Sequence, residues 1–195
     1  KYNPMNVMTL NTEKNITREK TAKPLLWIGI GSILMLFAGL TSAYIVRQAE
    51  GNWLQFELPK MFYLSTVIII ISSISMNYAL ISVKKNNITN MKIALALTLL
   101  LGLGFVFSQF SAWKALVGQE VFLVGNVAGS FLYVISGIHL AHIAGGIISL
   151  FVTLIKALKG QYHVQNKLGL ELCSIYWHFL DVLWIYLFLF FIFMR

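Results

Sequence analysis

Five long apolar stretches, each with at most one charged residue, constrain this chain more than any other feature. A helix of about 20 predominantly apolar residues crosses the hydrocarbon core of a bilayer, so each stretch is long enough to cross once. Only 11% of the 195 residues are charged, whereas soluble domains have about 25%. The sequence therefore predicts an all-α membrane protein, a five-transmembrane-helix bundle. The stretches are Leu25–Val46, Met61–Val83, Ile93–Trp113, Val121–Ile155 and Leu172–Met194.

The fourth stretch has 35 residues, which leaves room for a lead-in segment before the helix but not for two full helices. We expect residues 1–24 to form a polar N-terminal tail and residues 25–195 to form one membrane domain. The connections between the stretches are short, so function must lie inside the bundle or in contacts with other chains. The expected spans are 25–46, 61–83, 93–113, 130–155 and 171–194.

Lys and Arg residues are distributed unevenly between the two ends of the spans. Eleven lie in the tail and in the second and fourth connections, whereas four lie at the opposite end. Because cytoplasmic loops carry an excess of basic residues, we predict a cytoplasmic N-terminus and a C-terminus outside. This topology accounts for the net charge of +8, so we expect no nucleic acid partner. The single Cys173 excludes an internal disulfide.

Small polar residues gather on two of the expected helices. In the second span, Thr66, Ser73 and Asn77 share one helical face, with Ser65, Ser72 and Ser75 close by. This pattern is typical of hydrogen bonds between membrane helices. In the fourth span, Gly137, Ala141 and Gly145 follow one another at intervals of four residues. Such a stripe predicts the close approach of a neighbouring helix.

Asp181 is the one formal charge well inside an expected span. An intramembrane carboxyl group marks either a functional site or a structural hydrogen bond between helices, and we favour the structural reading. Helix rise places His139 at the depth of Asp181, and His142 at the depth of His178, in antiparallel fourth and fifth spans. We therefore expect these four residues to form a structural polar layer, with Asp181 accepting a hydrogen bond from His139 or from a tryptophan of a facing helix.

The spacing of His139 and His142, three residues apart on one helix, is compatible with metal ligation. A structural metal needs about four ligands. The chain has four histidines in total, one of which, His163, lies in a connection. The spacing alone does not predict a metal site, and we expect neither a metal nor a catalytic residue in this chain.

The run from Tyr176 to Asp181, followed by Trp184, resembles the YWHFVDxxW signature of subunit III of the haem–copper oxidases, the cytochrome c oxidase family; Trp177 belongs to it. In the fourth span, the residues from Gly129 to His142 are similar to that family's GSxFYxxTGxHGxHV segment, and in the third span Gly102 to Gln109 are similar to its LGxxFxxxQ. The resemblance extends in collinear order from about Trp27 to Phe190, and its supporting positions are Phe37, Tyr44, Arg47, Ser65, Thr66, Ser72 and Ser73.

The resemblance implies the short five-helix form of this subunit, a multi-pass protein of the bacterial cytoplasmic (inner) membrane. Subunit III carries no haem and no copper. Haem a and copper are expected in the partner catalytic subunits of an aa3-type oxidase, which reduces O2 to water with electrons from cytochrome c and pumps protons. The expected partners are the catalytic subunit I, the other oxidase subunits, membrane lipids and, at a higher level, a respiratory supercomplex. The implied role is to support complex stability, lipid binding and proton uptake, with phospholipid near Arg47 and Trp27.

Two positions depart from the family pattern. Ile33 follows Ser32 where the family usually has a carboxylate, and Leu140 replaces a glycine between the two histidines. The first departure puts in doubt any role that depends on that carboxylate. The alternative function is a small proton-coupled transporter or channel that uses Asp181 and the intramembrane histidines. Transporters commonly have repeated halves and interrupted helices, and five unlike spans without an internal proline show neither, so the sequence favours the oxidase subunit.

Overall fold

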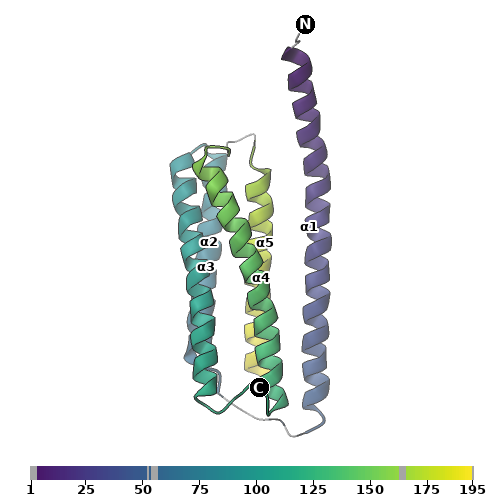
Figure 1. The fold of residues 1–195 in the computed structure, drawn as a ribbon, viewed down its shortest axis with the longest axis vertical. Coiled ribbons are helices and arrows are strands. Elements are labelled where there is room, and N and C mark those ends of the chain that lie inside the picture. Colours follow the sequence, from purple (N-terminus) through teal and green to yellow (C-terminus); the bar gives the residue numbers. More distant parts are fainter. Residues whose placement is uncertain (1–3, 52, 54–56, 163–165, 195) are drawn as a thin grey trace.

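The computed structural model describes residues 4–51, 53, 57–162 and 166–194, with the side chains of the first helix described from Lys20 onward. Its secondary structure over these residues is dominated by five α-helices (Figure 1), and each is long and apolar enough to cross a membrane. The predicted all-α, five-helix membrane fold is confirmed. The helices are α1 (Pro4–Gln48), α2 (Lys60–Lys84), α3 (Ile88–Val117), α4 (Val127–Leu158) and α5 (Leu168–Met194).

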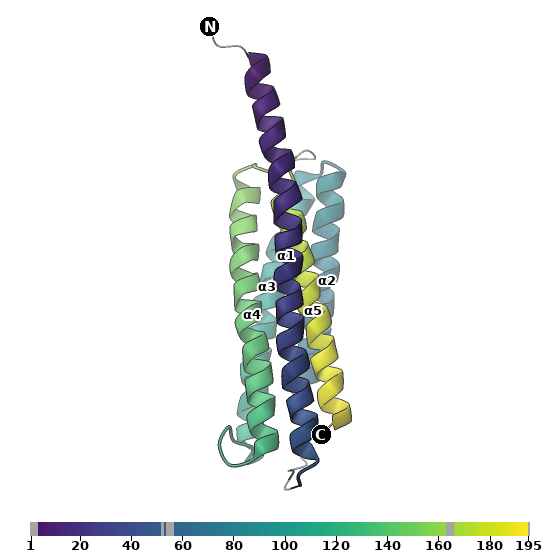
Figure 2. The same cartoon turned by 90° about the vertical axis from the view of Figure 1, so that its right-hand side faces the viewer.

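Four of the helices form a closed ring, in which α2 packs against α3, α3 against α4, α4 against α5, and α5 against α2. Helix α1 lies outside this ring and packs against α4 and α5 (Figure 2). In the described part of the chain the Cα atoms of α1 lie more than 8 Å from those of α2 and α3. The ring is therefore the core of the molecule, and α1 covers one side of it.

Helix α1 begins at Pro4 and includes Pro24, so the residues expected to form the tail continue the first helix. The N-terminal part of α1 extends beyond the ends of the other four helices (Figure 1). The apolar part that can cross a membrane covers Lys20–Gln48. The boundary of a separate tail near residue 24 remains a prediction.

The lead-in segment expected before the fourth span precedes α4, which begins at Val127. Its first residue, Val121, is buried. A Cβ atom on Gly129 would lie 2.9 Å from the carbonyl oxygen of Phe122, so only glycine allows the segment to fold back this closely on the first turn of α4. The side chain of Asn126 then caps α4 by accepting a hydrogen bond of 2.8 Å from the amide of Ala128.

Candidate functional site

Trp177, at the centre of the α5 signature, is fully buried against α2, α3 and α4. Its indole Nε1 donates a hydrogen bond of 3.1 Å to the hydroxyl oxygen of Ser72 on α2. A Cβ atom on Gly102 of α3 would lie 2.7 Å from Cη2 of this ring, and one on Gly146 of α4 would lie 3.2 Å from Cζ3. Two glycines and one serine therefore make the space that Trp177 fills.

Two more tryptophans donate to hydroxyl groups across helix interfaces. Nε1 of Trp184 lies 3.1 Å from Oγ1 of Thr66, which joins α5 to α2 a second time. Nε1 of Trp113 lies 3.1 Å from Oγ of Ser136, which joins α3 to α4. The hydrogen bonds predicted for the polar residues of the second span are thus confirmed for Ser72 and Thr66.

His139 is fully buried among aromatic rings. It stacks on Trp184 with ring centroids 5.3 Å apart, and its edge contacts involve Phe37 of α1 and Phe105 of α3. Neither ring nitrogen of His139 has a hydrogen-bond partner among the described residues. The imidazole packs here as a flat aromatic ring.

Asp181 is also buried, and both of its carboxylate oxygens lack a hydrogen-bond partner within the described part of the chain. The hydrogen bond predicted from His139 or from a tryptophan is therefore wrong. Nδ1 of His178 lies 3.8 Å from Oδ2 of Asp181, beyond hydrogen-bond distance. Nδ1 of His178 instead makes a hydrogen bond of 2.7 Å with the hydroxyl of Ser73 on α2.

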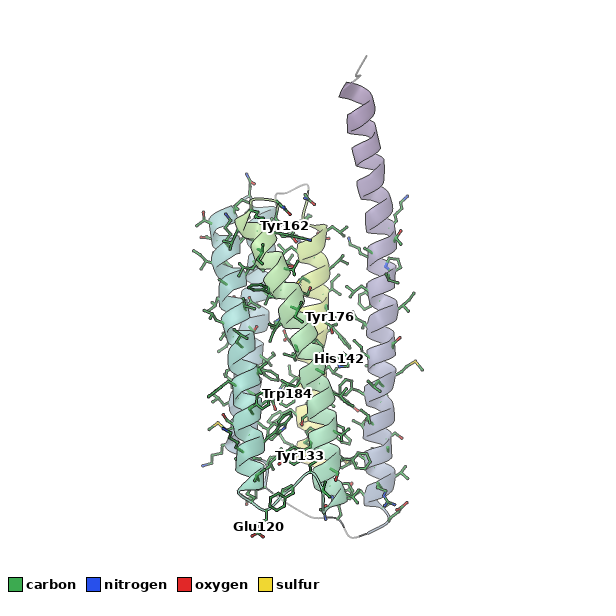
Figure 3. The ribbon with its side chains drawn as sticks, in the orientation of Figure 1. Glu120, Tyr133, His142, Tyr162, Tyr176 and Trp184 are labelled. Carbon is green, nitrogen blue, oxygen red and sulfur yellow. The ribbon has the colours of Figure 1, made fainter. Side chains whose placement is uncertain are left out.

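His142 lies on the side of α4 that faces α1 (Figure 3), where its ring contacts Phe37 with centroids 5.8 Å apart. Its Nδ1 donates to the carbonyl oxygen of Ile138, 2.8 Å away, and the hydroxyl of Tyr176 donates to the carbonyl oxygen of His142, 3.3 Å away. Gln109 donates through Nε2 to the hydroxyl oxygen of Ser65, 3.2 Å away, between α3 and α2. Like Trp177 and Trp184, these signature residues join neighbouring helices.

The two residues expected near lipid lie toward opposite ends of the apolar part of α1, Lys20–Gln48. Trp27 is 60% exposed. Arg47 is exposed and forms an ion pair with Glu50. Both side chains are accessible from outside the chain.

Not all of the small-residue stripe predicted in the fourth span packs against a neighbouring helix. Ala141 and Gly145 are exposed, and the nearest atom to a Cβ on Gly145 would be the Tyr176 hydroxyl oxygen at 3.9 Å. The close approach of α5 to α4 occurs at Gly146, one residue further along. The prediction of close packing at Gly145 is therefore wrong by about 100° of helix rotation.

The described residues contain no group of three or more His, Cys, Asp or Glu side chains close enough to share a metal ion. His139 and His142 face different surroundings, one inside the ring and the other toward α1. His163 lies outside the described residues. The site is thus an assembly of packed aromatic rings and interhelical hydrogen bonds.

Sequence reasoning did not identify Phe37 and Gly146 as packing residues. Phe37 is fully buried although it lies on the least buried helix, and it reaches both His139 and His142. Phe37 appeared in the sequence only as a matching position of a family pattern. Gly146 adjoins the predicted stripe, and the choice between neighbouring glycines depends on helix rotation, which spacing does not provide.

The comparisons with known proteins all indicate the same family. The family model described as cytochrome c oxidase subunit III matches residues 54–195. Cytochrome c oxidase subunit 3 of Bacillus sp. (strain PS3) is 28% identical over 182 residues, which are 90% of this chain and 87% of the relative. The probable cytochrome c oxidase subunit 3 of Nocardia farcinica is 30% identical over 83% of this chain and 82% of the relative. The subunit 3 of Bacillus subtilis is 27% identical over 83% and 81%, respectively.

Proposed function

The chain belongs to the cytochrome c oxidase subunit III family, and from this premise we propose that it is the non-redox subunit of an aa3-type oxidase in a bacterial cytoplasmic membrane. It is a multi-pass membrane protein and an accessory subunit of a proton-translocating haem–copper oxidase. The family match across residues 54–195 carries this conclusion. A proton-coupled transporter is not favoured, because the relatives that align with most of this chain are named as subunits of cytochrome c oxidase.

The proposed role of the chain is structural support of the complex, together with lipid binding and support of proton uptake. The signature residues support the structural part, because Trp177, Trp184 and Gln109 each bond to a neighbouring helix. Of the proposed structural polar layer, His139, His142, His178 and Asp181, only His178 has a side-chain hydrogen bond to another helix among the described residues, the bond to Ser73 of α2. The rings of His139 and His142 contribute packing against Trp184 and Phe37.

Arg47 and Trp27 are proposed phospholipid contacts. The exposed indole of Trp27 suits the polar–apolar boundary of a bilayer, and the exposed guanidinium of Arg47 suits a phosphate. Haem a and copper are proposed to reside in the catalytic subunits, with subunit I and the other oxidase subunits as partners. A larger respiratory supercomplex remains an expectation from the resemblance.

The proposed orientation places the N-terminus in the cytoplasm. Lys85 and Gln119 are exposed in connections at opposite ends of the bundle, while the native Cys173 is buried. Lys85→Cys and Gln119→Cys should therefore react with an impermeant thiol reagent from opposite sides of the membrane. Labelling of Lys85→Cys from outside intact cells would reverse the orientation.

Affinity purification of the tagged chain from membranes tests the proposed function. We expect haem a, copper and the catalytic subunits to co-purify in constant proportion to the chain, with the absorption spectrum of an oxidase. Purification of the chain without haem-bearing partners, under detergent conditions that preserve oxidase activity, would refute the proposal.

A further inference from the structure

Three polar residues mark the outer surface where α2 meets α5, and we call them the midplane polar patch: Ser73, Asn77 and His178. Ser73 contacts His178 directly, and Asn77 follows Ser73 by four residues, one turn along the same face of α2. Asn77 is exposed, Ser73 is partly buried, and 35% of the His178 side chain is accessible. Helices α2 and α5 are in direct contact and run side by side (Figure 2). The patch is thus open to whatever surrounds the chain.

The imidazole of His178 is held from one side only. Its Nδ1 bonds to the Ser73 hydroxyl at 2.7 Å, with the Asp181 carboxylate 3.8 Å away on the inner side. Nε2 has no hydrogen-bond partner among the described residues, nor has the side-chain amide of Asn77. A histidine ring nitrogen and an amide both need partners when they are removed from water. The patch therefore has unmet hydrogen-bonding capacity.

The depth of the patch determines which partners can reach it. Ser73 lies 13 residues after Lys60 and 11 residues before Lys84, the two ends of α2. At a rise of about 1.5 Å per residue, both ends are roughly 16–20 Å away, which places Ser73 near the middle of a hydrocarbon core about 30 Å thick. Lipid headgroups and bulk water do not reach this depth, and a polar group left there without a partner is costly. A polar side chain of another protein can satisfy it.

The surroundings of the patch suit a helix rather than a water-filled path. Ile70, Ile74 and Val182 border it and are 42%, 65% and 65% exposed. Apolar side chains around a small polar centre fit an apolar transmembrane helix that carries one hydrogen-bonding residue.

Hydroxyl groups on other outer faces do not create the same need. Ser32 on α1 donates to the carbonyl oxygen of Ile28 at 3.1 Å, and Ser111 on α3 donates to that of Phe107 at 3.0 Å. Each of these serines is satisfied by its own helix. The unmet capacity of His178 and Asn77 therefore distinguishes the α2–α5 face from the faces that carry those serines.

We propose that the midplane polar patch is the docking surface for a transmembrane helix of a catalytic oxidase subunit, whose hydrogen-bonding side chain pairs with Nε2 of His178 and the amide of Asn77. This inference rests on the proposed function, which provides the partner chains. The contacting side chain is an amide, a hydroxyl or a carboxylic acid, because each of these bonds to both an imidazole and an amide.

Site-specific photocrosslinking in the intact membrane complex tests the proposal. A photoreactive phenylalanine at Asn77 should form an adduct with a catalytic subunit, identified by mass spectrometry. The same probe at Phe107, which is 77% exposed on α3, is the matched control and should react with lipid. Adducts from Asn77 with lipid alone, or with a second copy of this chain, would overturn the proposal, and so would an adduct with the catalytic subunit from Phe107 but not from Asn77.

Substitution provides the second measurement. Asn77→Leu should reduce the fraction of catalytic subunit retained on the tagged chain in detergent at least about three-fold, the equivalent of roughly one interhelical hydrogen bond. Ser32→Ala, on a self-satisfied serine, should leave retention unchanged. Equal retention for both variants would contradict the docking surface. In that case, haem a bound to the tagged wild-type complex would show that the proposed function still holds. If the wild-type complex contained no haem a, both the docking surface and the proposed function would be refuted.

Discussion

Helix α1 and helix α5 are equally apolar, yet they are buried to very different extents. The most apolar window of each has a mean hydropathy of 1.9, but 17% of that window is buried for α1 and 44% for α5. In a bilayer, apolar surface gains nothing by leaving lipid for protein, so packing and hydrogen bonds decide which helices associate. The comparison teaches that hydropathy locates a span and does not place it in the bundle.

The two helices are also held by different interactions. Helix α5 has buried indole hydrogen bonds to α2 at Trp177 and Trp184. Helix α1 inserts Phe37 toward the histidines of α4, and its polar contacts to α5 include Thr41 with Tyr186 at 3.0 Å and Lys23 with Glu171 at 3.3 Å. We expect α5 to be integral to the fold and α1 to be the more easily separated helix.

Trp177→Ala should have the largest effect. The substitution removes the ring that fills the space between α2, α3 and α4, and it leaves a cavity that costs about 3–5 kcal/mol. The chain should leave the detergent-solubilised complex at a much lower temperature than wild type, as measured by subunit retention after heating. Val182→Ala, on an exposed position of the same helix, is the control. Equal behaviour of the two variants would show that α5 is not the central helix.

Phe37→Ala should separate α1 from the ring while the ring survives. The loss of a fully buried phenylalanine costs up to about 3–5 kcal/mol, reduced here because lipid can enter the space from outside. The distribution of distances between spin labels on α1 and α4 should broaden, whereas the distribution between labels on α2 and α5 should not. Broadening of both distributions would mean that α1 is part of the same cooperative unit.

Gly102→Ala should destabilise α3 packing by about 1–3 kcal/mol, because the added methyl group would meet the buried Trp177 ring at 2.7 Å. Gly104→Ala is a matched control on the same helix, where the nearest atom would be Cγ2 of Ile68 at 4.0 Å. Retention of the chain after heating should fall only for Gly102→Ala. If both variants lose the chain at the same temperature, contact with Trp177 is not the cause, and neither is helix propensity, which favours alanine over glycine.

Thr66→Val should cost about 1–2 kcal/mol, since it leaves the buried Nε1 of Trp184 without an acceptor. Asp181→Asn should cost less than about 1 kcal/mol, because neither carboxylate oxygen makes a hydrogen bond among the described residues. Heating of the two variant complexes in parallel measures the difference. Loss of the chain in Asp181→Asn but not in Thr66→Val would invert this assignment.

Lys23→Ala should have the smallest effect, no more than about 1 kcal/mol. The Lys23–Glu171 pair is partly exposed, and such pairs contribute little. A double-mutant cycle with Glu171→Gln isolates this pair, with the free energy of α1 separation taken at low and high salt from the populations of short and long α1–α4 label distances. A coupling as large as the effect of Phe37→Ala would show that α1 is attached by charge rather than by packing.

The sequence was sufficient for the five spans, but not for the full length of α1, which begins at Pro4, or for the rotation of the helices. Apolar length predicts five spans, and Val121–Ile155 correctly includes a lead-in segment before α4. Depth follows from residue number, but the direction of a side chain around the helix axis depends on packing. His139 therefore stacks on Trp184 instead of bonding to Asp181, and Gly146 rather than Gly145 meets α5.

The family resemblance was readable because its motif residues have fixed packing roles. Trp177 contacts a hydroxyl on α2 and glycines on α3 and α4, so its packing depends on particular residue types in three other helices. The docking surface could not be read in this way. Asn77 appeared in the sequence as one more small polar residue, and only the fold shows that it is exposed, one turn of α2 from the Ser73–His178 contact.

The most direct test of the central claim, that this chain supports an oxidase without holding its redox centres, is the metal and haem content of the complex with and without it. The chain is removed with a stronger detergent, and haem a, copper and the absorption spectrum are measured per mole of catalytic subunit. We predict unchanged haem a and copper, with a loss of sustained turnover. A loss of haem a or copper in proportion to the chain removed would contradict the account.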